Sequence, residues 1–422
     1  MVIGGAEVDQ TTPRPAQSGI LIVGAGLAGL TLALALARKG VKTTVIEKQN
    51  EIAPSKWAIL LYPIGMKIFQ DLGVLEGIMS LAMPLKDSQV DTLGGRTLAT
   101  IHAGLLLKDF DYSLGIGPSE IRMVLRKHVL ESGVELLEGA KYVGAVKDAG
   151  SGRVIGARCT QDGQEFVFSS RLLVGADGYK SRVREDFAVK TESREYPPVV
   201  GIMVRHRHGL DRFHMVLASG YQVVMLPISL DLMQVGLTER RITEEELIKR
   251  GEGYVKKRIS DAVPSLSQVL DASGANFRDE SMLVIRPQEI WAKSYAVDGG
   301  VLVGDAAHSF HPGTGQGAQQ SFLDAQILAP VIERGVNTGD FSRESLREYE
   351  KPRQTLMGFW KGNSQRLISM ETADGRFGIW MRNRYMRKVD KITERREVQE
   401  VLLGLRPPSR MELLQLTLSL LF

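Results

Sequence analysis

Two kinds of hydrophobic pattern alternate along the chain. The first is a long uncharged run interrupted by a glycine-rich turn, as in "GILIVGAGLAGLTLALALA" over residues 19–37. This run is almost long enough to cross a bilayer. However, Arg38-Lys39-Gly40 closes it and "VKTTVIEK" follows as a short apolar strand. The pattern therefore predicts a buried strand, a turn, a helix and a second strand, and no stable membrane insertion.

The second pattern is an alternation of apolar and polar residues. Segments such as "FHMVLASG" and "YQVVMLPISLDLMQVGLTE" show it, and alternation predicts strands with one buried face. From Tyr349, "YEKPRQTLMGFWKGNSQRL" continues as a helix with alternating charge. The final "LLQLTLSLLF" is apolar at alternate positions. We interpret it as a tail that packs on the core, with a membrane contact as the alternative.

Composition limits the possible functions. The 422 residues suit two interlocked domains, and 43% hydrophobic with 24% charged residues is typical of a globular protein. The single cysteine, Cys159, excludes an internal disulfide framework, which favours a reducing compartment, with the cytoplasm as the default. The formal charge of +4 comes from basic residues scattered among acids, so we expect no nucleic-acid partner.

The first turn has the chemistry of a dinucleotide site. Gly24, Gly26 and Gly29 form G-x-G-x-x-G directly after an apolar strand. The first glycine allows the tight turn, the second lets the backbone approach a pyrophosphate, and the third lets helix and strand pack closely. The helix N-terminus presents free N–H groups to the phosphates. Glu47 ends the second strand, where a carboxylate would accept both hydroxyls of an adenosine ribose, as in FAD or NAD.

Two further motifs choose between these cofactors. "LLVGADGYKSRVR" (172–184) and "VLVGDAAHSFHPGTGQG" (301–317) are apolar strands that end in Asp177-Gly178 and in Gly304-Asp305. With the first motif, in this order and spacing over about residues 19–355, they resemble the single-component FAD-dependent monooxygenases of the aromatic and ubiquinone-biosynthesis hydroxylase type. In "EIRMVLRKHVL", Arg122 resembles the family's arginine that faces the flavin ribityl-phosphate region; a solvated helix charge is the alternative.

The resemblance implies an α/β fold: a Rossmann-like FAD-binding domain (GR2 type) with an interleaved mixed β-sheet substrate domain and C-terminal helices. We predict a loose extension at 1–18 and an FAD-binding domain from 19–84, 116–185 and 297–345. The substrate-binding sheet domain comes from 85–115 and 186–296, and a C-terminal helical region spans 346–422.

The resemblance also implies roles for the later motifs. Asp305 would accept a hydrogen bond from a ribityl hydroxyl, and Pro312 would wall the oxygen-reaction pocket. The turn up to Gly317 precedes a helix expected to begin near Gln319, whose N-terminus stabilises the reduced flavin anion. Asp177 could merely cap the helix that contains Ser181. The resemblance implies instead that it orients the arginine and the backbone near the flavin pyrophosphate and the route of the nicotinamide donor, and we prefer this second role. The predicted cofactor-binding residues are Gly24, Ala25, Gly26, Leu27, Ala28, Gly29, Glu47, Lys48, Arg122, Asp177, Asp305, Pro312, Gly315, Gln316, Gly317 and Ala318.

Three observations complicate this assignment. His308 and His311 could bind a metal, but no third ligand stands at a recognised spacing. We therefore predict no metal. The resemblance implies a backbone hydrogen bond for His308 beside the flavin, and we expect His311, just before Pro312, to shape the turn. Lys56 and Trp57 stand where the family commonly has Gly or Arg, and Gln319 stands where many relatives have Asn.

The predicted activity is insertion of one oxygen atom from O2, through a flavin C4a-hydroperoxide, into an aromatic, polycyclic or isoprenoid small molecule of secondary metabolism. NADH or NADPH donates the electrons, and we expect a monomer or homodimer. The predicted catalytic residues are Pro312 and Gly313 at the flavin, and His214 or Tyr221 as a base for a phenol, with plain strand packing as the alternative for these two. A flavoprotein reductase of unsaturated isoprenoids, or a flavin-binding protein without turnover, are the alternative functions.

Overall fold

The computed structural model describes residues 19–102, 109–278 and 281–393, with short pieces at 13–15, 400, 409 and 411–412. The apolar C-terminal tail considered above and most of the predicted extension at 1–18 lie outside these residues. Within that extension, Pro13–Pro15 form β1, which pairs in parallel with β12 (Gln164–Ser169).

A six-stranded sheet forms the centre of the nucleotide-binding half. Its order is β21-β22-β13-β2-β3-β9, and all neighbouring pairs are parallel except β21 with β22. The bounds are β2 Ile20–Val23, β3 Thr44–Glu47, β9 Glu135–Glu138, β13 Leu172–Gly175, β21 Ala296–Val297 and β22 Gly300–Leu302. All residues of β2, β13 and β22 are buried. Their uninterrupted apolar runs thus reflect a parallel sheet covered on both faces.

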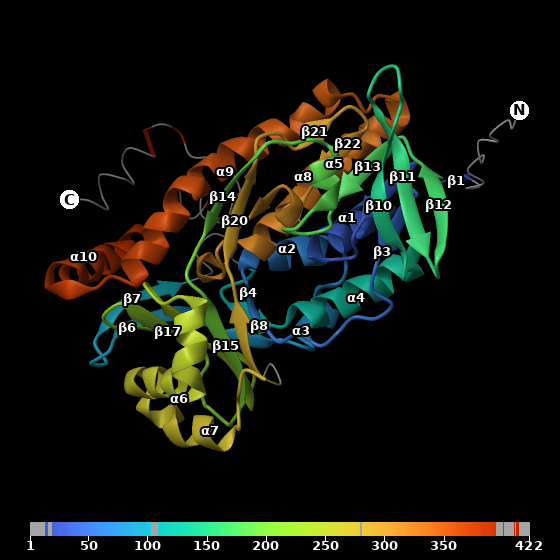
Figure 1. The fold of residues 1–422 in the computed structure, drawn as a ribbon. Coiled ribbons are helices and arrows are strands. Elements are labelled where there is room, and N and C mark those ends of the chain that lie inside the picture. Colours follow the sequence, from blue (N-terminus) through green and yellow to red (C-terminus); the bar gives the residue numbers. More distant parts are fainter. Residues whose placement is uncertain are drawn as a thin grey trace, which may run out of the picture.

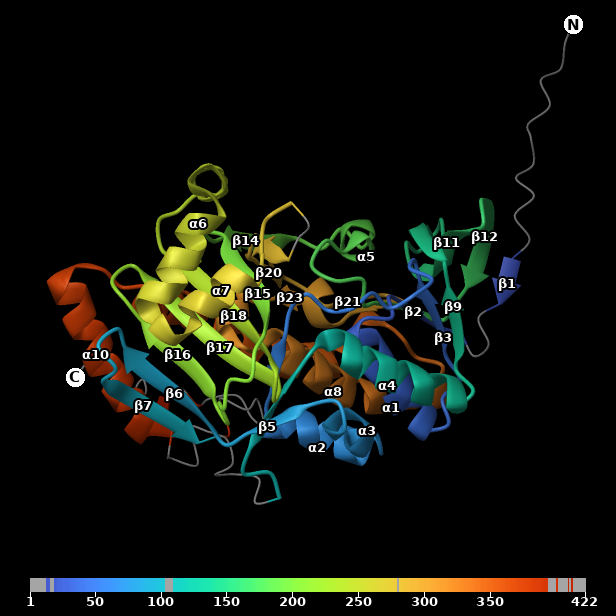
Figure 2. The ribbon, with the colours of Figure 1, turned by 90° about the horizontal axis from the view of Figure 1, so that it is seen from below.

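Helices pack beside this sheet (Figures 1 and 2). α1 (Leu27–Arg38) packs on α8 (Gly317–Thr338) and on α4 (Pro118–Glu131), while α2 (Pro63–Asp71) packs on α8 and α3 (Leu75–Met79) on α4. A four-stranded sheet of β1, β12, β10 (Lys141–Lys147) and β11 (Val154–Gln161) adjoins them, with Cys159 buried in the core. The smaller sheet β4-β8-β5 comprises Ile59–Leu61, Ser113–Ile116 and Met83–Leu85.

A seven-stranded sheet of order β19-β15-β18-β17-β16-β6-β7 forms the second half. Its bounds are β6 Asp87–Thr92, β7 Thr97–His102, β15 Val199–Arg205, β16 Phe213–Leu217, β17 Tyr221–Ser229, β18 Leu232–Glu239 and β19 Met282–Ile285. β6 pairs in parallel with β16, so two stretches far apart in the sequence complete one sheet. Buried residues of α6 (Glu244–Ala262) and α7 (Ser267–Ala272) share a core with one face.

The C-terminal helices connect the two halves. α9 (Arg343–Glu371) runs alongside α8 and continues toward the seven-stranded sheet, where α10 (Gly375–Thr393) packs on β7 (Figure 1). The sheet β14-β20-β23 (Thr191–Glu195, Gln288–Ala292 and His308–Ser309) and α5 (Arg182–Asp186) complete the connection. None of the helices described meets the length and apolarity needed to cross a membrane.

Candidate active site

The three motifs meet where the parallel strands β2, β13 and β22 end. Gly24 is in the left-handed region at φ +106°, and a Cβ there would lie 2.5 Å from Ala176 O, so the first two motifs are in close contact. A Cβ on Gly304 would lie 2.8 Å from Ala28 Cβ, which brings the third motif against α1. The carboxyl ends of parallel strands form one edge of a sheet, and this edge places the three motifs together as predicted.

The glycines of the first motif differ in their surroundings. A Cβ on Gly29 would lie 1.9 Å from Gly24 O, so glycine is required there for helix and strand to approach. A Cβ on Gly26 would meet nothing within 4 Å, because this residue faces the open cavity. Gly26 is also the N-cap of α1, and no side chain caps the helix. The free N–H groups at this end are therefore available to an anionic ligand.

Glu47 and Arg122 lie together in a small cleft beside this turn. Glu47 Oε2 accepts a hydrogen bond of 2.8 Å from Ala25 N, and Arg122 Nε donates one of 3.1 Å to Ala25 O. Arg126, which pairs with Glu138, also lines the cleft. Arg122 is thus not a solvated helix charge, and its neighbour is the carboxylate predicted to hold the adenosine ribose. Lys48, also predicted to bind the cofactor, is exposed and lines neither this cleft nor the large cavity.

Asp177 caps α5, which is the interpretation that we did not prefer from the sequence. Its Oδ2 accepts hydrogen bonds from Arg182 N at 2.8 Å and Val183 N at 3.1 Å, and its Oδ1 accepts one from Ser181 Oγ. Burial raises the pKa of Asp177 despite these bonds. The capped helix holds Arg184, whose guanidinium donates to Ala306 O at 2.9 Å. Asp177 therefore links the second motif to the third through helix geometry.

The turn after β23 shapes the third motif. Asp305 lines the cavity, and a Cβ on Gly317 would lie 3.9 Å from Asp305 Oδ1. Burial raises the pKa of Asp305. α8 begins at Gly317, two residues before the start predicted near Gln319, because Gly317 and Ala318 already adopt helical geometry. The helix N-terminus consequently lies next to Asp305, in the wall of the cavity.

The two histidines of this turn serve different purposes. His311 Nδ1 accepts a hydrogen bond of 3.1 Å from Gly313 N, so it shapes the turn as predicted. Burial lowers the pKa of His311 to about 4. The backbone hydrogen bond predicted for His308 is wrong, since His308 Nε2 lies 2.9 Å from Asp324 Oδ2. The imidazole ring of His308 therefore contacts a carboxylate on the following helix and not a backbone carbonyl.

A buried cluster of charged groups, formed by Asp324, Arg353 and His308, adjoins the start of this turn at Gly304. Asp324 Oδ2 accepts a hydrogen bond of 2.7 Å from Gly304 N, and Arg353 Nε donates one of 2.6 Å to Asp324 Oδ1. Burial by itself would raise the pKa of Asp324, but the charges of His308 and Arg353 bring it down to about 2. The cluster joins the strand end at Gly304 to α8 and α9. It therefore fixes the backbone that precedes Asp305.

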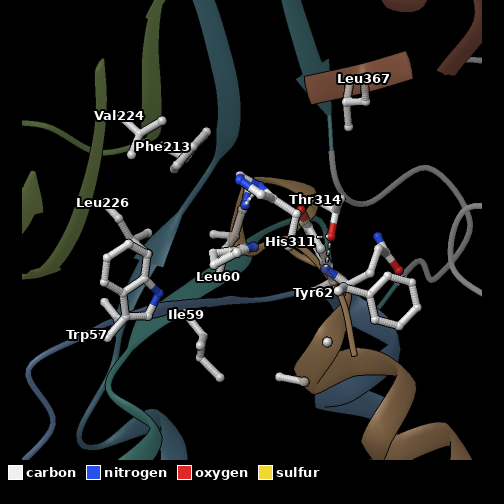
Figure 3. A pocket seen from close by; sticks show the side chains of 18 of the residues that line it. Trp57, Ile59, Leu60, Tyr62, Phe213, Val224, Leu226, His311, Thr314 and Leu367 are labelled. Atoms are coloured by element: carbon white, nitrogen blue, oxygen red, sulfur yellow. Dashed lines mark hydrogen bonds between the residues drawn. The ribbon is translucent and has the colours of Figure 1, made fainter. Parts of the chain in front are cut away.

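A cavity of about 680 Å³ extends from these turns to the seven-stranded sheet. Predicted cofactor-binding residues line it at one end: Gly26, Leu27, Ala28, Asp305, Pro312, Gly315, Gln316, Gly317 and Ala318, joined by Gly313. Trp57, Leu60, Phe213, Val224 and Leu226 form an apolar wall that faces His311 and Thr314 (Figure 3). The free helix ends of α1 and α8, the space at Gly26 and the Glu47 cleft fit a dinucleotide flavin, with an apolar compartment beside it.

The structure corrects the predicted bases. Phe213 and Met215 line the cavity, so His214, between them on β16, points to the other face of the sheet and lies 2.8 Å from Asp91 Oδ2. Tyr221 packs against α6, where the guanidinium of Arg258 lies 4.5 Å from its ring centre. Alternation along the strands thus removes both side chains from the cavity.

Four polar residues that were not predicted from the sequence line the cavity instead of His214 and Tyr221. Gln222, Gln234, Tyr62 and Glu371 line the cavity among its apolar residues. Trp57, noted above for its departure from the family pattern, also lines it, and Ala58 N beside it donates to Gln234 Oε1. The cavity-lining residues of α9 follow a helical stripe with a carboxylate at its end: Phe359, Trp360, Asn363, Leu367 and Glu371. That spacing is a signal that the sequence contains.

The fold and site define a flavin-dependent oxidoreductase that binds a dinucleotide flavin beside an apolar compartment. Residues 17–357 match the model of the FAD binding domain family, so the chain belongs to that family. A 6-methylpretetramide 4-monooxygenase from Streptomyces rimosus is 29% identical over 349 residues, which cover 79% of this chain and 80% of the relative. A 2-heptyl-3-hydroxy-4(1H)-quinolone synthase from Pseudomonas aeruginosa strain UCBPP-PA14 is 26% identical over 396 residues, covering 91% and 98%.

The solved structures agree on the fold. The crystal structure of p-nitrophenol 4-monooxygenase from Pseudomonas putida DLL-E4 matches with a TM-score of 0.78 at 22% identity, covering 92% of this chain and 99% of that one. The match of residues 17–357 to the FAD binding domain family confirms the predicted family and cofactor, and the solved structure confirms the fold class. The protein is an FAD-dependent monooxygenase of the aromatic hydroxylase type, and use of NADH or NADPH is typical of this family.

Proposed function

We propose that this monooxygenase inserts one atom of O2 into an apolar aromatic or polycyclic small molecule held between the turn at Pro312–Gly317 and the seven-stranded sheet. The observation that carries the proposal is the continuity of one cavity from the predicted flavin-binding turns to the apolar wall at Phe213 and Leu226. Ligand sites of this kind are mostly apolar with a few placed polar groups. The relatives' names mention a pretetramide, a quinolone and a nitrophenol, which supports the same substrate class.

Bound FAD supplies the redox chemistry, taking electrons from NADH or NADPH and activating O2. The residues of this chain would bind FAD and orient it. Glu47 would hold the adenosine ribose, the N-terminus of α1 the pyrophosphate, and Asp305 a ribityl hydroxyl. The N–H groups at Gly317 and Ala318 would stabilise negative charge on the reduced ring.

The apolar residues of the compartment exclude water. Phe213, Val224 and Leu226 come from the sheet, and Pro312 closes the side nearest the turn. Exclusion of water protects a reactive oxygen species from loss and directs it to the substrate. Hydroxylation, epoxidation and Baeyer-Villiger insertion all fit this arrangement. Secondary metabolism, a cytoplasmic location and a monomeric or homodimeric state stay predictions from the sequence.

The experiment is a screen of aromatic and polycyclic compounds against the FAD-loaded protein. We expect a productive compound to accelerate NADH or NADPH oxidation, to consume O2, and to gain one oxygen atom that carries the label when heavy-isotope O2 is supplied. Ligand-dependent oxidation of the donor without oxygen uptake would favour the reductase alternative. A purified protein that refuses FAD would contradict the proposal altogether.

A further inference from the structure

We propose that Glu371, held in place by Gln222, accepts the proton of a hydroxyl group on the aromatic substrate, so that the compartment selects phenols. This inference rests on the proposed function and adds the substrate class and the base. It replaces His214 and Tyr221, which the structure places on the other face of the sheet.

The first support is the position of the carboxylate. Glu371 is the last residue of α9, is 3% exposed and lines the cavity. Gln222 on β17 also lines it, and Gln222 Nε2 donates a hydrogen bond of 3.0 Å to Glu371 Oε2. Gln222 Oε1 is buried and has no hydrogen-bond partner in the described part of the chain. The pair thus offers a carboxylate and an unused amide oxygen, both of which accept hydrogen bonds.

The second support is proximity to the flavin-binding turn. One helical turn before Glu371, Ile368 Cδ1 lies 2.9 Å from the position that a Cβ on Gly313 would take. The Tyr62 hydroxyl lies 2.7 Å from the corresponding position on Gly315, and its pKa is raised to about 12 by burial and by the charge of Glu371. The helix that carries Glu371 and the tyrosine whose pKa it raises therefore both lie against the turn at which the oxygen chemistry is proposed.

The third support is the absence of a compensating cation. Among the described residues, no Lys, Arg or His forms an ion pair with Glu371. A buried carboxylate without a partner is costly, and burial raises the pKa of Glu371 to about 8 although Gln222 opposes the shift. Tyr62 and Tyr385 also line the cavity, and the charge of Glu371 contributes to the raised pKa of both hydroxyl groups. Burial and Glu371 raise the pKa of Tyr385, and Arg366 opposes this rise only in part, while Arg382 of α10 donates to Ala218 O. These neighbours leave the carboxylate to a ligand.

The proton transfer is balanced within the site. The O–H bond of the substrate breaks, its proton goes to a carboxylate oxygen of Glu371, and the electron pair stays on the substrate oxygen. A phenolate is more electron-rich at its ring carbons than a phenol, which favours attack on an electrophilic oxygen. Because the side chains from the sheet at Phe213, Val224 and Leu226 are apolar, a substrate with a single phenolic hydroxyl on an otherwise apolar ring system fits the compartment. Gln222 is a positioning residue in this scheme.

The test compares two probes and matched variants of the FAD-loaded protein. 2-Naphthol carries the hydroxyl, and 2-methoxynaphthalene has the same rings without a proton to give. We measure both dissociation constants by calorimetry from about pH 6 to about pH 9, around the raised pKa of the carboxyl, in the parent and in Glu371→Gln and Gln222→Leu. Glu348→Gln, an exposed position on the same helix, is the control. Flavin content and melting temperature verify that each variant folds.

We expect the parent to bind 2-naphthol roughly tenfold more tightly than its methyl ether, since a hydrogen bond to a charged group has this strength. The preference should increase with pH through the ionisation of Glu371. In Glu371→Gln the pH dependence should disappear, and in Gln222→Leu the preference should shrink to about a third or less. A purely structural link between helix and sheet would lower the melting temperature without removing the pH dependence.

Three results would contradict the role of Glu371. A parent that binds both probes equally, or fails to bind 2-naphthol, or a Glu371→Gln variant that keeps the parent's pH profile, overturns the role of Glu371. Failure of the proposed function has a different signature, namely no FAD uptake, or no O2 consumption by the parent with either NADH or NADPH. A flavin-loaded, oxygen-consuming parent with no probe preference would thus contradict only the inference.

Discussion

Arg353 Nε donates a hydrogen bond of 2.6 Å to Asp324 Oδ1, and both side chains are almost completely buried beside the strand end at Gly304. Asp324 Oδ2 accepts in addition from Gly304 N. The ion pair thereby couples the end of β22 to two helices whose residues are distant in the sequence.

We predict that Arg353→Met lowers the free energy of unfolding by up to roughly 3–5 kcal/mol, because the buried Asp324 then keeps only His308 as a cationic partner. Flavin affinity should fall as well, since Gly304 precedes Asp305 in the turn. Urea unfolding and FAD titration measure the two effects. The double variant Arg353→Met with Asp324→Leu should recover part of the stability, and a single variant as stable as the parent would show that the pair does not support the turn.

Gly26 and Gly29 give a matched pair of single-methyl changes. Gly29→Ala should lower the melting temperature, because its Cβ would lie 1.9 Å from Gly24 O, and overpacking costs about 1–3 kcal/mol. Gly26→Ala should leave the melting temperature of the FAD-free protein unchanged, since no protein atom lies within 4 Å of its Cβ. Its affinity for FAD should nevertheless fall at least about tenfold, because the methyl group blocks the approach of the pyrophosphate. Equal FAD affinity in Gly26→Ala and the parent would show that the cofactor does not pass this residue.

For His311 we predict that the stability of the folded protein falls at acidic pH. Burial lowers its pKa from 6.5 to about 4, so between these values the unfolded chain binds more protons than the folded one, and stability is lost as the pH falls. We expect this group to account for about 3 kcal/mol over that window. His311→Asn, which keeps an acceptor for Gly313 N, should have a correspondingly flatter dependence of unfolding free energy on pH. Parallel curves for the two proteins would contradict the prediction.

For Glu371 we predict the opposite dependence of stability on pH. Burial raises its pKa from 4.5 to about 8, so the folded state binds more protons between these values, and stability falls as the pH rises. Glu371→Gln should therefore stabilise the protein more at about pH 9 than at about pH 5, by up to about 5 kcal/mol. Thermal unfolding of both proteins at the two pH values measures the difference. A stabilisation independent of pH would mean that the carboxyl group titrates normally.

The local chemistry of this protein can be predicted from its sequence. The turn at Gly24–Gly29, the carboxylate at Glu47 and the strand ends at Asp177 and Asp305 depend on residues a few positions apart, and parallel strands then bring their ends to one edge. For this reason the family, the cofactor and the meeting of the three motifs at one edge of the sheet could be predicted. The start of α8 was misplaced by two residues because glycine is a weak indicator of a helix start.

Only the tertiary structure decided which side chains line the substrate compartment. Strand alternation turns His214 and Tyr221 away and Gln222 inward, and a shift of one residue in a strand would reverse this. Glu371 reaches the cavity from a helix that crosses between the two halves, and Asp324 meets Arg353 through the packing of α8 on α9. Such contacts depend on the register and packing of segments far apart in the chain, which local sequence patterns do not specify.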